Sequence, residues 1–499
     1  MKFTKILPDS LRARNFAAQT VEVKAHIRRL GSAARRFSVS SADFLSVLIV
    51  LSLAVVAIFN SLNRANAASP AQSSTVTPSY TNYAAPNGLG TSAGEPSIGV
   101  NWNTGNVMFI AGLETLRVSF NDSVSPAAAT WQDKSTLLTS LTSFDPILFT
   151  DSATGRTIVS QLLPNKMSIA AMTDNDGDTW TPILGFGINS GVDHQTIGGG
   201  KYAPAILGGP ILGYPNTFYY ASQDIGLAEI ARSDDGGLTF GPAVPMYNLT
   251  QCGGLHGHIK VAPDGTVYVP NKSCGGKQGV VVSTDNGLTW KIRTVPGSTA
   301  GKTDPSVGIG ANNTVYIGYA DGNGHPKVAV SRDRGATWTN TQDVGTAFGI
   351  QQTVFPAMVA GDDDRASFVF IGTPTGGDGT STDTNFAGVW HLYVATTFDG
   401  GQTWTTVDAT PNDPVQRGVI CTNGTTCPSG TRNLLDFNDA TVDKQGRLLV
   451  AFADGCITND CIQGRDRNAD GRVNSLDNDG AALATITRQS GGTDLFAAR

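Results

Sequence analysis

The chain of 499 residues contains almost no glutamate and, after residue 70, no long stretch of helical periodicity. Of its 41 acidic residues only four are Glu, at positions 22, 95, 114 and 229, so Asp dominates. Glycine, with 58 residues, and proline, with 24, are abundant instead. Asp, Gly and Pro are turn residues, and their excess over helix-forming patterns is typical of strands joined by many turns. The composition therefore predicts an all-β fold and excludes a helical architecture for this part of the chain.

The one pronounced apolar run lies near the N-terminus. Basic residues between positions 28 and 36 precede an apolar stretch at 44–59, and the tripeptide Ala65-Asn66-Ala67 has the small-x-small form of a cleavage site. The pattern predicts a signal peptide over residues 1–67 and hence a secreted, extracellular or periplasmic protein. The apolar run is short for a membrane-spanning helix, which needs about 20 residues; an uncleaved membrane anchor is the alternative. Residues 68–90, rich in Ser, Thr, Pro and Ala, are expected to form a flexible leader.

Removal of this segment changes the net charge. Residues 1–67 hold ten Lys or Arg and three Asp or Glu, a net of +7, so the formal charge falls from −6 to −6 − 7 = −13. A strongly acidic chain is not expected to bind nucleic acid or to capture polyanions broadly. A carbohydrate ligand remains compatible with this charge.

An eight-residue tract of the form S-x-D-x-G-x-T-W recurs along the chain. The third residue is Asp in four copies and Asn175 in the copy at 173–180. The Asp carboxylate can accept backbone N–H bonds, the Gly can take a positive φ, and the aromatic ring can pack beneath the next strand. The closing aromatic residues lie at 180, 240, 290, 338 and 404, so the spacings are 60, 50, 48 and 66 residues. These spacings are close to the length of a four-stranded propeller blade. The copies are Thr173–Trp180, Ser233–Phe240, Ser283–Trp290, Ser331–Trp338 and Thr397–Trp404.

The tract resembles the Asp-box (BNR repeat) of the sialidase-like β-propellers, a superfamily that includes sialidases, other glycoside hydrolases and sortilin-type receptors. The resemblance covers about residues 90–499. It implies that each copy joins the third and fourth strands of a blade, and strand-like segments do precede the copies, as in Gly279–Val282 and Lys327–Val330.

The number of blades can be counted independently from the expected inner strands, each of which opens with a short apolar run after an acidic, His or Phe residue. These openings are Glu95–Ile98, Asp145–Leu148, His194–Ile197, His258–Val261, Asp304–Val307, Phe355–Met358 and Asp439–Val442. Degenerate tracts at 119–131 and 487–496 supply the two missing blade ends. Seven starts and seven ends predict a seven-bladed propeller with four-stranded blades over residues 91–499.

All six cysteines lie after the signal segment, at 252, 274, 421, 427, 456 and 461. An even number in an exported chain predicts disulfides. Fifteen pairings are possible, and the sequential one is favoured because each bond closes a local loop. A metal site is the alternative, although no pair has the C-x₂-C spacing of a zinc site.

Residues 466–477 have the spacing of a calcium loop. Side-chain oxygens at the first, third, fifth, ninth and twelfth positions, a carbonyl at the seventh and Gly471 at the turn match the needs of Ca²⁺. The loop resembles an EF-hand or dockerin repeat, but a dockerin has two such loops with helices, whereas here a strand of the last blade is expected to follow. A structural Ca²⁺ in an insertion at 456–480 is therefore predicted, with a solvated Asp/Asn turn and cohesin binding as alternatives. The expected metal residues are Asp466, Asn468, Asp470, Arg472, Asn474 and Asp477.

The residues that open the inner strands are expected to surround one mouth of the central channel, since the resemblance places ligands at that face. Paired carboxylates there could act as acid and base in glycoside cleavage, and His side chains could bind a metal or carry protons. The alternative is structural, because acidic residues before Pro often only form turns. Within the ring, His256 and His258 form an H-x-H pair that Cys252 and Cys274 would brace. The candidate catalytic residues are Asp145, Asp193, His194, His256, His258, Asp304 and Asp439, and Glu95 belongs to the same ring.

Two classes of function remain open. The first is a secreted carbohydrate-active enzyme of the glycoside hydrolase or polysaccharide lyase type, and the second is a noncatalytic propeller that binds a glycan or a protein. A true sialidase is disfavoured, because the Arg-Ile-Pro tract of that family is absent and only Arg417 and Arg432 stand in a loop that could reach the mouth. A carbohydrate partner and a monomeric state are expected, and contact with a membrane only through an uncleaved N-terminal segment.

Overall fold

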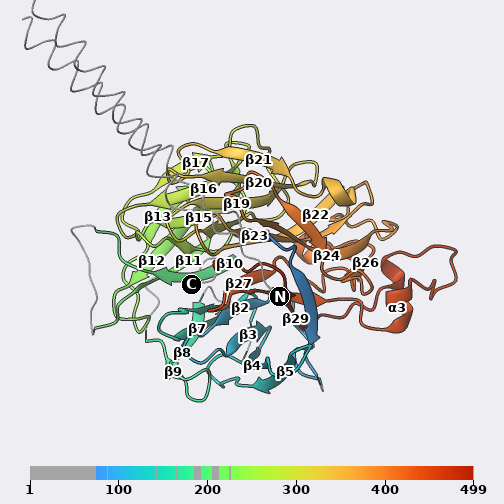
Figure 1. The fold of residues 1–499 in the computed structure, drawn as a ribbon, viewed down its shortest axis with the longest axis horizontal. Coiled ribbons are helices and arrows are strands. Elements are labelled where there is room, and N and C mark those ends of the chain that lie inside the picture. The colour runs from blue at the N-terminus through green and yellow to red at the C-terminus, as the bar shows by residue number, and fades with distance from the viewer. Residues whose placement is uncertain are drawn as a thin grey trace, which may run out of the picture. The chain divides into compact units, whose positions relative to one another are not determined.

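The computed structural model describes residues 75–86, 88–141, 143–163, 167–184, 193–204, 213–223 and 226–497. The predicted signal peptide and most of the predicted leader lie outside these residues. The described chain forms seven antiparallel sheets, each with four main strands, and Figure 1 shows them around a common centre in chain order. The prediction of an all-β, seven-bladed propeller is confirmed.

The first four blades run from the N-terminal side in simple strand order. Blade 1 contains β2 (Ser97–Val100), β3 (Val107–Ala111), β4 (Glu114–Asn121) and β5 (Ala128–Asp133). Blade 2 contains β6 (Pro146–Thr150), β7 (Thr157–Leu163), β8 (Met167–Thr173) and β9 (Thr181–Pro182). Blade 3 contains β10 (Asp193–Gly200), β11 (Thr217–Gln223), β12 (Leu227–Ser233) and β13 (Val244–Asn248). Blade 4 contains β14 (Lys260–Val261), β15 (Val267–Cys274), β16 (Lys277–Ser283) and β17 (Lys291–Thr294).

The last three blades carry the longer connections. Blade 5 contains β18 (Ser306–Ile309), β19 (Val315–Ala320), β20 (Pro326–Ser331) and β21 (Thr339–Asp343), and the 3₁₀ turn η2 (Thr346–Phe348) follows it. Blade 6 contains β22 (Gln352–Ala360), β23 (Ala366–Thr373), β24 (Val389–Thr397) and β25 (Thr405–Asp408), with β26 (Gln416–Arg417) paired to β24. Blade 7 contains β27 (Asp439–Val442), β28 (Leu448–Asp454), β29 (Leu483–Gly491) and β1 (Ser79–Ala84). The short helices η3 (Gly424–Thr426), α3 (Asn459–Gln463) and η4 (Ser475–Asp477) lie in its connections.

Blade 7 closes the ring with both ends of the described chain. The outermost strand β1 pairs antiparallel with β29, with Tyr83 opposite Ile486. Part of the segment expected as a flexible leader is therefore a strand. The expected degenerate tract at 487–496 also differs, since residues 487–491 continue β29. Both differences have the same physical reason. Blade 7 contains strands from both ends of the described chain, and the pairing of β1 with β29 closes the ring of blades.

The recurring tract forms the same turn in each blade where it is intact. In blade 4, Asp285 Oδ1 accepts the Thr289 N–H at 2.9 Å, Oδ2 accepts the Thr289 hydroxyl, and Gly287 takes φ +81°. In blade 2, Asn175 Oδ1 accepts the Thr179 N–H at 2.9 Å in the same way. The turn therefore needs an acceptor oxygen at this position and not a negative charge.

The fourth residue of this turn holds the preceding blade. In blade 4 it is Asn286, whose side chain accepts the Ala203 N–H at 2.7 Å and donates to the Ala203 carbonyl at 3.3 Å. In blade 5 it is Arg334, which pairs with Asp264 at 2.8 Å. The repeated turn thus connects the third and fourth strands of its own blade and also bonds to the blade before it.

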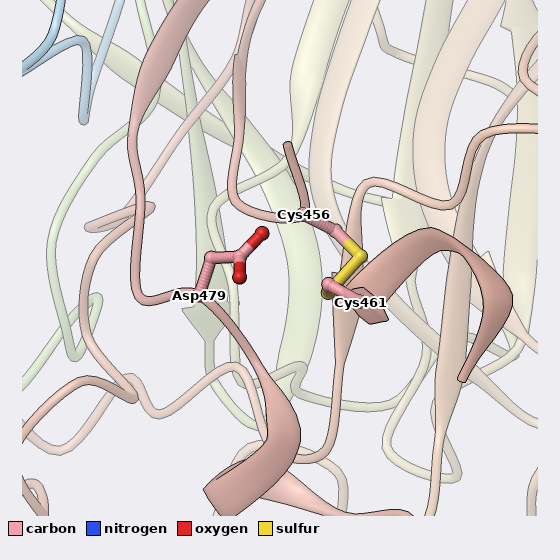
Figure 2. Close-up of side chains that lie close together, drawn as sticks. All are labelled: Cys456, Cys461 and Asp479. Atoms are coloured by element: carbon pink, nitrogen blue, oxygen red, sulfur yellow. A yellow bond between two sulfur atoms is a disulfide. The ribbon is translucent and has the colours of Figure 1, made fainter. Parts of the chain in front are cut away.

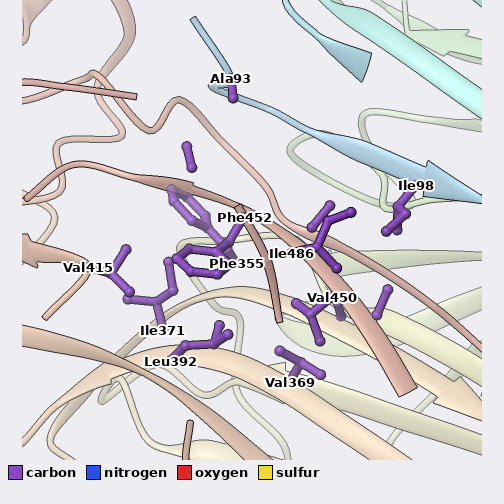
Figure 3. Close-up of a cluster of buried hydrophobic side chains, with 14 of the residues drawn as sticks. Ala93, Ile98, Phe355, Val369, Ile371, Leu392, Val415, Val450, Phe452 and Ile486 are labelled. Atoms are coloured by element: carbon purple, nitrogen blue, oxygen red, sulfur yellow. The ribbon is translucent and has the colours of Figure 1, made fainter. Parts of the chain in front are cut away.

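Apolar packing fills the interior of the blades. The largest buried cluster joins blades 1, 6 and 7 and includes Ile98, Phe355 and Val450. Figure 3 shows part of this cluster, with Ile371, Val415 and Ile486 among its side chains. A buried side chain of this size contributes roughly 1.5–3 kcal/mol relative to exposure. Each blade therefore gains stability mainly from the faces it shares with its neighbours.

Three disulfides connect all six cysteines: Cys252 to Cys274, Cys421 to Cys427, and Cys456 to Cys461. The sequential pairing is confirmed, and it indicates an oxidising, extracellular-type environment. No helix of the described residues is long and apolar enough to cross a membrane.

Candidate active site

Side chains from blades that are not neighbours meet at the end of the channel where the inner strands begin. His194 lies in β10 of blade 3 and Asp304 precedes β18 of blade 5, yet His194 Nε2 and Asp304 Oδ2 are 3.0 Å apart. His258 precedes β14 of blade 4, and its Nδ1 lies 3.8 Å from Oδ1 of Asp439, which opens β27 of blade 7. The structure therefore brings these four predicted residues together across the channel.

A group of acidic side chains occupies the part of the mouth beside blades 1 and 2. Glu95 is buried, and burial, reinforced by the charges of Asp145 and Asp436, raises the pKa of its carboxyl well above the usual value. Asp436 is itself held by Arg432, whose Nη1 and Nη2 donate to its two oxygens at 2.7 and 2.5 Å. Asp145 Oδ2 accepts the Gln195 N–H at 2.7 Å. Burial and the two neighbouring acidic side chains therefore favour the protonated form of Glu95.

Asp304 has the opposite electrostatic environment. Burial alone would raise the pKa of this carboxyl, but the Lys272 ammonium, 3.3 Å away, and the His194 ring hold the pKa well below its usual value. Burial also raises the pKa of the Asp439 carboxyl, but the opposing effect of Lys260 and His258 is larger, so its pKa is lowered. The mouth therefore holds protonated and ionised carboxyls side by side.

The H-x-H pair contributes two rings of different character. His256 is fully buried, and burial, with a further contribution from His194, lowers its pKa to about 3, so the ring is neutral. Its Nδ1 lies 3.2 Å from the Gly257 carbonyl, whereas its Nε2 has no hydrogen-bond partner within the described chain. The His256 and His194 rings are 5.6 Å apart in an edge-to-face arrangement. The disulfide between Cys252 and Cys274 closes this loop, as the sequence predicts.

Three backbone positions at the mouth adopt an unusual conformation. Glu95, His194 and Leu435 have φ values of +58°, +61° and +60°, the left-handed region that non-glycine residues rarely enter. Such strain persists only where surrounding contacts enforce it, and it concentrates at functional sites. Here it turns Glu95 and His194 toward the channel mouth.

Several residues of the site escaped sequence reasoning. Asp436 and Phe437 come from the loop before β27, and the Phe437 ring packs on the His258 ring with centroids 4.5 Å apart. Lys260 and Lys272 neutralise Asp439 and Asp304. The H-x-K spacing of His258 and Lys260 was the available signal, because alternate residues of an extended segment share a face.

Two other candidates take different positions. Asp193 begins β10, and its side chain lies outside the described part of the chain. Arg417 donates to the carbonyls of Cys461 and Ile462, so it holds the blade 7 insertion and not the mouth.

The predicted calcium loop lies between β28 and β29 and curls around its own oxygens. Asp466 accepts the N–H groups of Asp470 and Gly471 at 3.2 and 2.7 Å. Asp477, which is fully buried, accepts the N–H of Asn474 at 3.0 Å. The remaining members also bond locally: Asn468 accepts from Asp470, Asp470 accepts from Arg472, and Asn474 accepts from Leu476.

Close to this loop, Cys456, Cys461 and Asp479 place potential ligand atoms within 4.8 Å of one another. Figure 2 shows these three side chains close together. The two sulfurs are joined in a disulfide, so they are not thiolate ligands. Asp479 already accepts N–H groups from Ile457, Thr458 and Arg467. These contacts stabilise the insertion. Because the sulfurs form a disulfide and the Asp479 carboxylate is hydrogen-bonded, these three residues are not a candidate metal site.

Comparison with known proteins found distant structural matches. No family model and no curated protein matches the chain. Among solved structures, a protein of unknown function from Dyadobacter fermentans is 13% identical, covers 83% of this chain and 99% of its own, and has a TM-score of 0.40. The GH74 enzyme of Niastella koreensis is 16% identical over 76% of this chain and 53% of its own, with a TM-score of 0.44. The intramolecular trans-sialidase of Ruminococcus gnavus is 11% identical over 82% of this chain and 96% of its own, with a TM-score of 0.38.

Proposed function

We propose that this chain is a carbohydrate-active enzyme of the glycoside hydrolase type, with its reaction at the channel mouth described above. The observation that carries the proposal is the contrast between two buried carboxyls at the mouth, since the environment of Glu95 raises its pKa and the environment of Asp304 lowers its pKa. Carboxyls whose environments separate their pKa values in this way are suited to act as acid and base in one reaction.

The proposed reaction is hydrolysis of a glycosidic bond. Glu95 would donate its proton to the leaving oxygen as the bond from that oxygen to the anomeric carbon breaks. Asp304, whose negative charge Lys272 and His194 stabilise, would take a proton from a water whose oxygen forms the new bond. To complete the cycle, Asp304 would release its proton to solvent and Glu95 would regain one from solvent, and the nearby side chains of Asp145 and Asp436 favour the protonated form of Glu95.

Access to Glu95 depends on the segment before β27. Glu95 is 4% exposed, whereas the side chains of Asp304 and His258 keep 11% and 13% of their surfaces exposed. Phe437 packs on His258 and faces His194 at 6.1 Å, so it covers the centre of the mouth. In the proposed cycle Phe437 moves aside for the substrate, and its ring then offers an apolar surface to a sugar face.

The test uses the mature protein, residues 68–499, with a panel of polysaccharides and oligosaccharides. Release of reducing ends is expected for at least one substrate, and Glu95→Gln and Asp304→Asn are each expected to lower the rate about 10²–10⁴-fold. Asp178→Asn is the matched control, because it removes a carboxylate that is 52% exposed in the turn at the other face. Unsaturated products without hydrolysis would instead indicate a polysaccharide lyase, with a His as the base. No product from any substrate would overturn the enzymatic proposal.

A noncatalytic glycan-binding propeller is the second candidate. The observation in its favour is the burial of Glu95, Asp145 and His256. A buried polar network can hold the end of the channel closed and rigid without taking part in a reaction. Calorimetry with the same panel distinguishes the two, because this candidate requires binding without product release.

We also propose that the loop at 466–477 binds a structural Ca²⁺. Its support is the set of oxygen donors described above and the tight curl at Gly471, which has φ +83°. Arg472 would contribute its carbonyl. The ion would fix the insertion of blade 7 against the seam with blade 6, where Ser475 Oγ accepts the Val419 N–H at 2.9 Å.

A further inference from the structure

A cavity of about 320 Å³ lies at the seam between blades 1 and 7, at the end of the channel opposite the mouth. Its walls come from the turn after β2, which contains Trp102, from the turn after β27, which contains Lys444 and Gln445, and from Arg488 of β29. Inner strands begin at the mouth and end at these turns, so this cavity is separate from the proposed active site.

The cavity exists because the repeated turn is degenerate in blade 1. In blades 4 and 5 the turn residues Asn286 and Arg334 bind the preceding blade and cover the seam. In blade 1 the corresponding segment follows β4, and Asp122 makes the contact to blade 7 through Arg447 and Arg488. Blade 1 therefore lacks the turn that covers the seam in blades 4 and 5, and the cavity lies at the corresponding place between blades 1 and 7.

Four of the five charged side chains that line the cavity form ion pairs with one another, and the fifth, Lys444, is exposed. Asp122 accepts from Arg488 at 2.6 and 2.9 Å and from Arg447 at 2.9 Å. Asp443 accepts from Arg447 Nε at 2.7 Å. Two guanidinium groups thus face two carboxylates, and an ionic ligand would have to break one of these pairs at a cost of desolvation. An uncharged ligand would leave the pairs intact.

The other lining groups suit a ligand that carries many hydroxyls. The cavity wall includes the amides of Asn103, Asn106 and Gln445, which offer both donors and acceptors, and the rings of Trp102 and Phe120. Amphipathic rings can cover the C–H face of a sugar while the amides and ion pairs bind its hydroxyls. The volume is at the lower end for ligand pockets, which favours one ring over a chain of them.

We propose that this seam is a second, noncatalytic binding site for a neutral monosaccharide unit, either free or at the end of a glycan. The assignment does not depend on the enzymatic proposal. A site at the end of the channel opposite the mouth would bind the protein to a glycan and leave the mouth free for another ligand.

The experiment is ligand-observed NMR with the mature protein and a panel of neutral monosaccharides, with galacturonate and inorganic phosphate as charged probes. Gln445→Trp should fill the cavity from an exposed turn position and weaken neutral sugar binding at least about tenfold. Asn312→Trp is the matched control, because Asn312 is exposed at the equivalent position of the blade 5 turn, and it should leave binding unchanged. Glu95→Gln should also leave it unchanged.

Any of four results would overturn the assignment. The first three are no binding of any neutral sugar, binding that survives Gln445→Trp, and preferential binding of the charged probes that Lys444→Ala removes. Binding lost only in Glu95→Gln would place the sugar at the mouth and would also overturn it.

Discussion

His194 and Asp304 are in contact across the channel, with 3.0 Å between Nε2 and Oδ2, although blade 4 stands between the blades that carry them. Blade 4 contributes Lys272, whose Nζ lies 3.3 Å from the other oxygen of Asp304. A single carboxylate therefore connects three blades at the mouth. This convergence makes the mouth one connected cluster of side chains rather than a row of separate strand openings.

Asp454 should make the stability of the protein decrease as the pH rises. Burial, with a smaller contribution from Asp413 and Asp479, raises its pKa to about 8. A carboxyl with a raised pKa in the folded state binds its proton more tightly there than in the unfolded chain, so its contribution is full below pH 4 and is lost as the pH approaches 8. Asp454→Asn keeps an acceptor for the Cys456 N–H and should raise Tm by a few degrees at pH 9, as measured by calorimetry.

At pH 4 the Asp454→Asn variant and the parent protein should unfold at nearly the same temperature. Asp178→Asn, at an exposed position, should show no such pH-dependent gain. Equal Tm differences at pH 4 and pH 9 would contradict the assignment of a protonated Asp454.

The disulfide between Cys252 and Cys274 should contribute more to stability than the one between Cys421 and Cys427. The first closes a loop with a sequence separation of 22 and the second one of 6. Loop-closure entropy gives about 3 kcal/mol for the first and about 2 kcal/mol for the second. Replacing each pair by Ser and measuring chemical denaturation compares them directly. A larger loss from the 421–427 pair would contradict the expectation.

The fold could be predicted from the sequence because its signals are local. The turn around Asp285 and Gly287 repeats in the chain, and each inner strand opens with a recognisable tract, so both the blade type and the number seven follow. The strand β1 could not be recognised, because Ser79–Ala84 is a strand through its pairing with β29, which lies about 400 residues later in the chain. Part of the candidate site could also be predicted, because the signals for those residues are local. His194, His258, Asp304 and Asp439 lie at strand openings, whereas Asp436 and Phe437 reach the mouth through a loop.

Removal of β1 should open the ring. A chain that begins at residue 75 keeps β1 and should unfold at the same temperature as the chain from residue 68. A chain that begins at residue 86 lacks β1, which leaves β29 with an unpaired edge and loses the Tyr80 packing against the largest apolar cluster. It should unfold at a much lower temperature and aggregate, as light scattering and calorimetry would measure. Equal stability of the two truncated chains would contradict the role of β1.

The repeated turn should tolerate amides but not apolar residues at its central position. Asp285→Asn retains the oxygen that accepts the Thr289 N–H, as Asn175 does for Thr179 in blade 2. Asp285→Ala loses that acceptor, and about 1–2 kcal/mol of unfolding free energy should be lost with it. Urea denaturation of the two variants tests this, and a similar loss for both would show that the charge matters and not the acceptor.

Calcium should stabilise blade 7 if the loop at 466–477 holds the ion. A chelator should lower Tm of the parent protein, because a ligand present at about 100 times its Kd stabilises by about 2.7 kcal/mol. Asp470→Ala removes an oxygen donor from the loop and should make Tm insensitive to the chelator. Asp460→Ala, in α3 next to the loop and 51% exposed, is the matched control and should respond like the parent. Calorimetric titration should give one calcium per chain for the parent and the control and none for Asp470→Ala. A parent protein with neither a calcium heat nor a chelator-dependent Tm would leave residues 466–477 as a solvated turn, held by the bonds that Asp466 makes to Asp470 and Gly471.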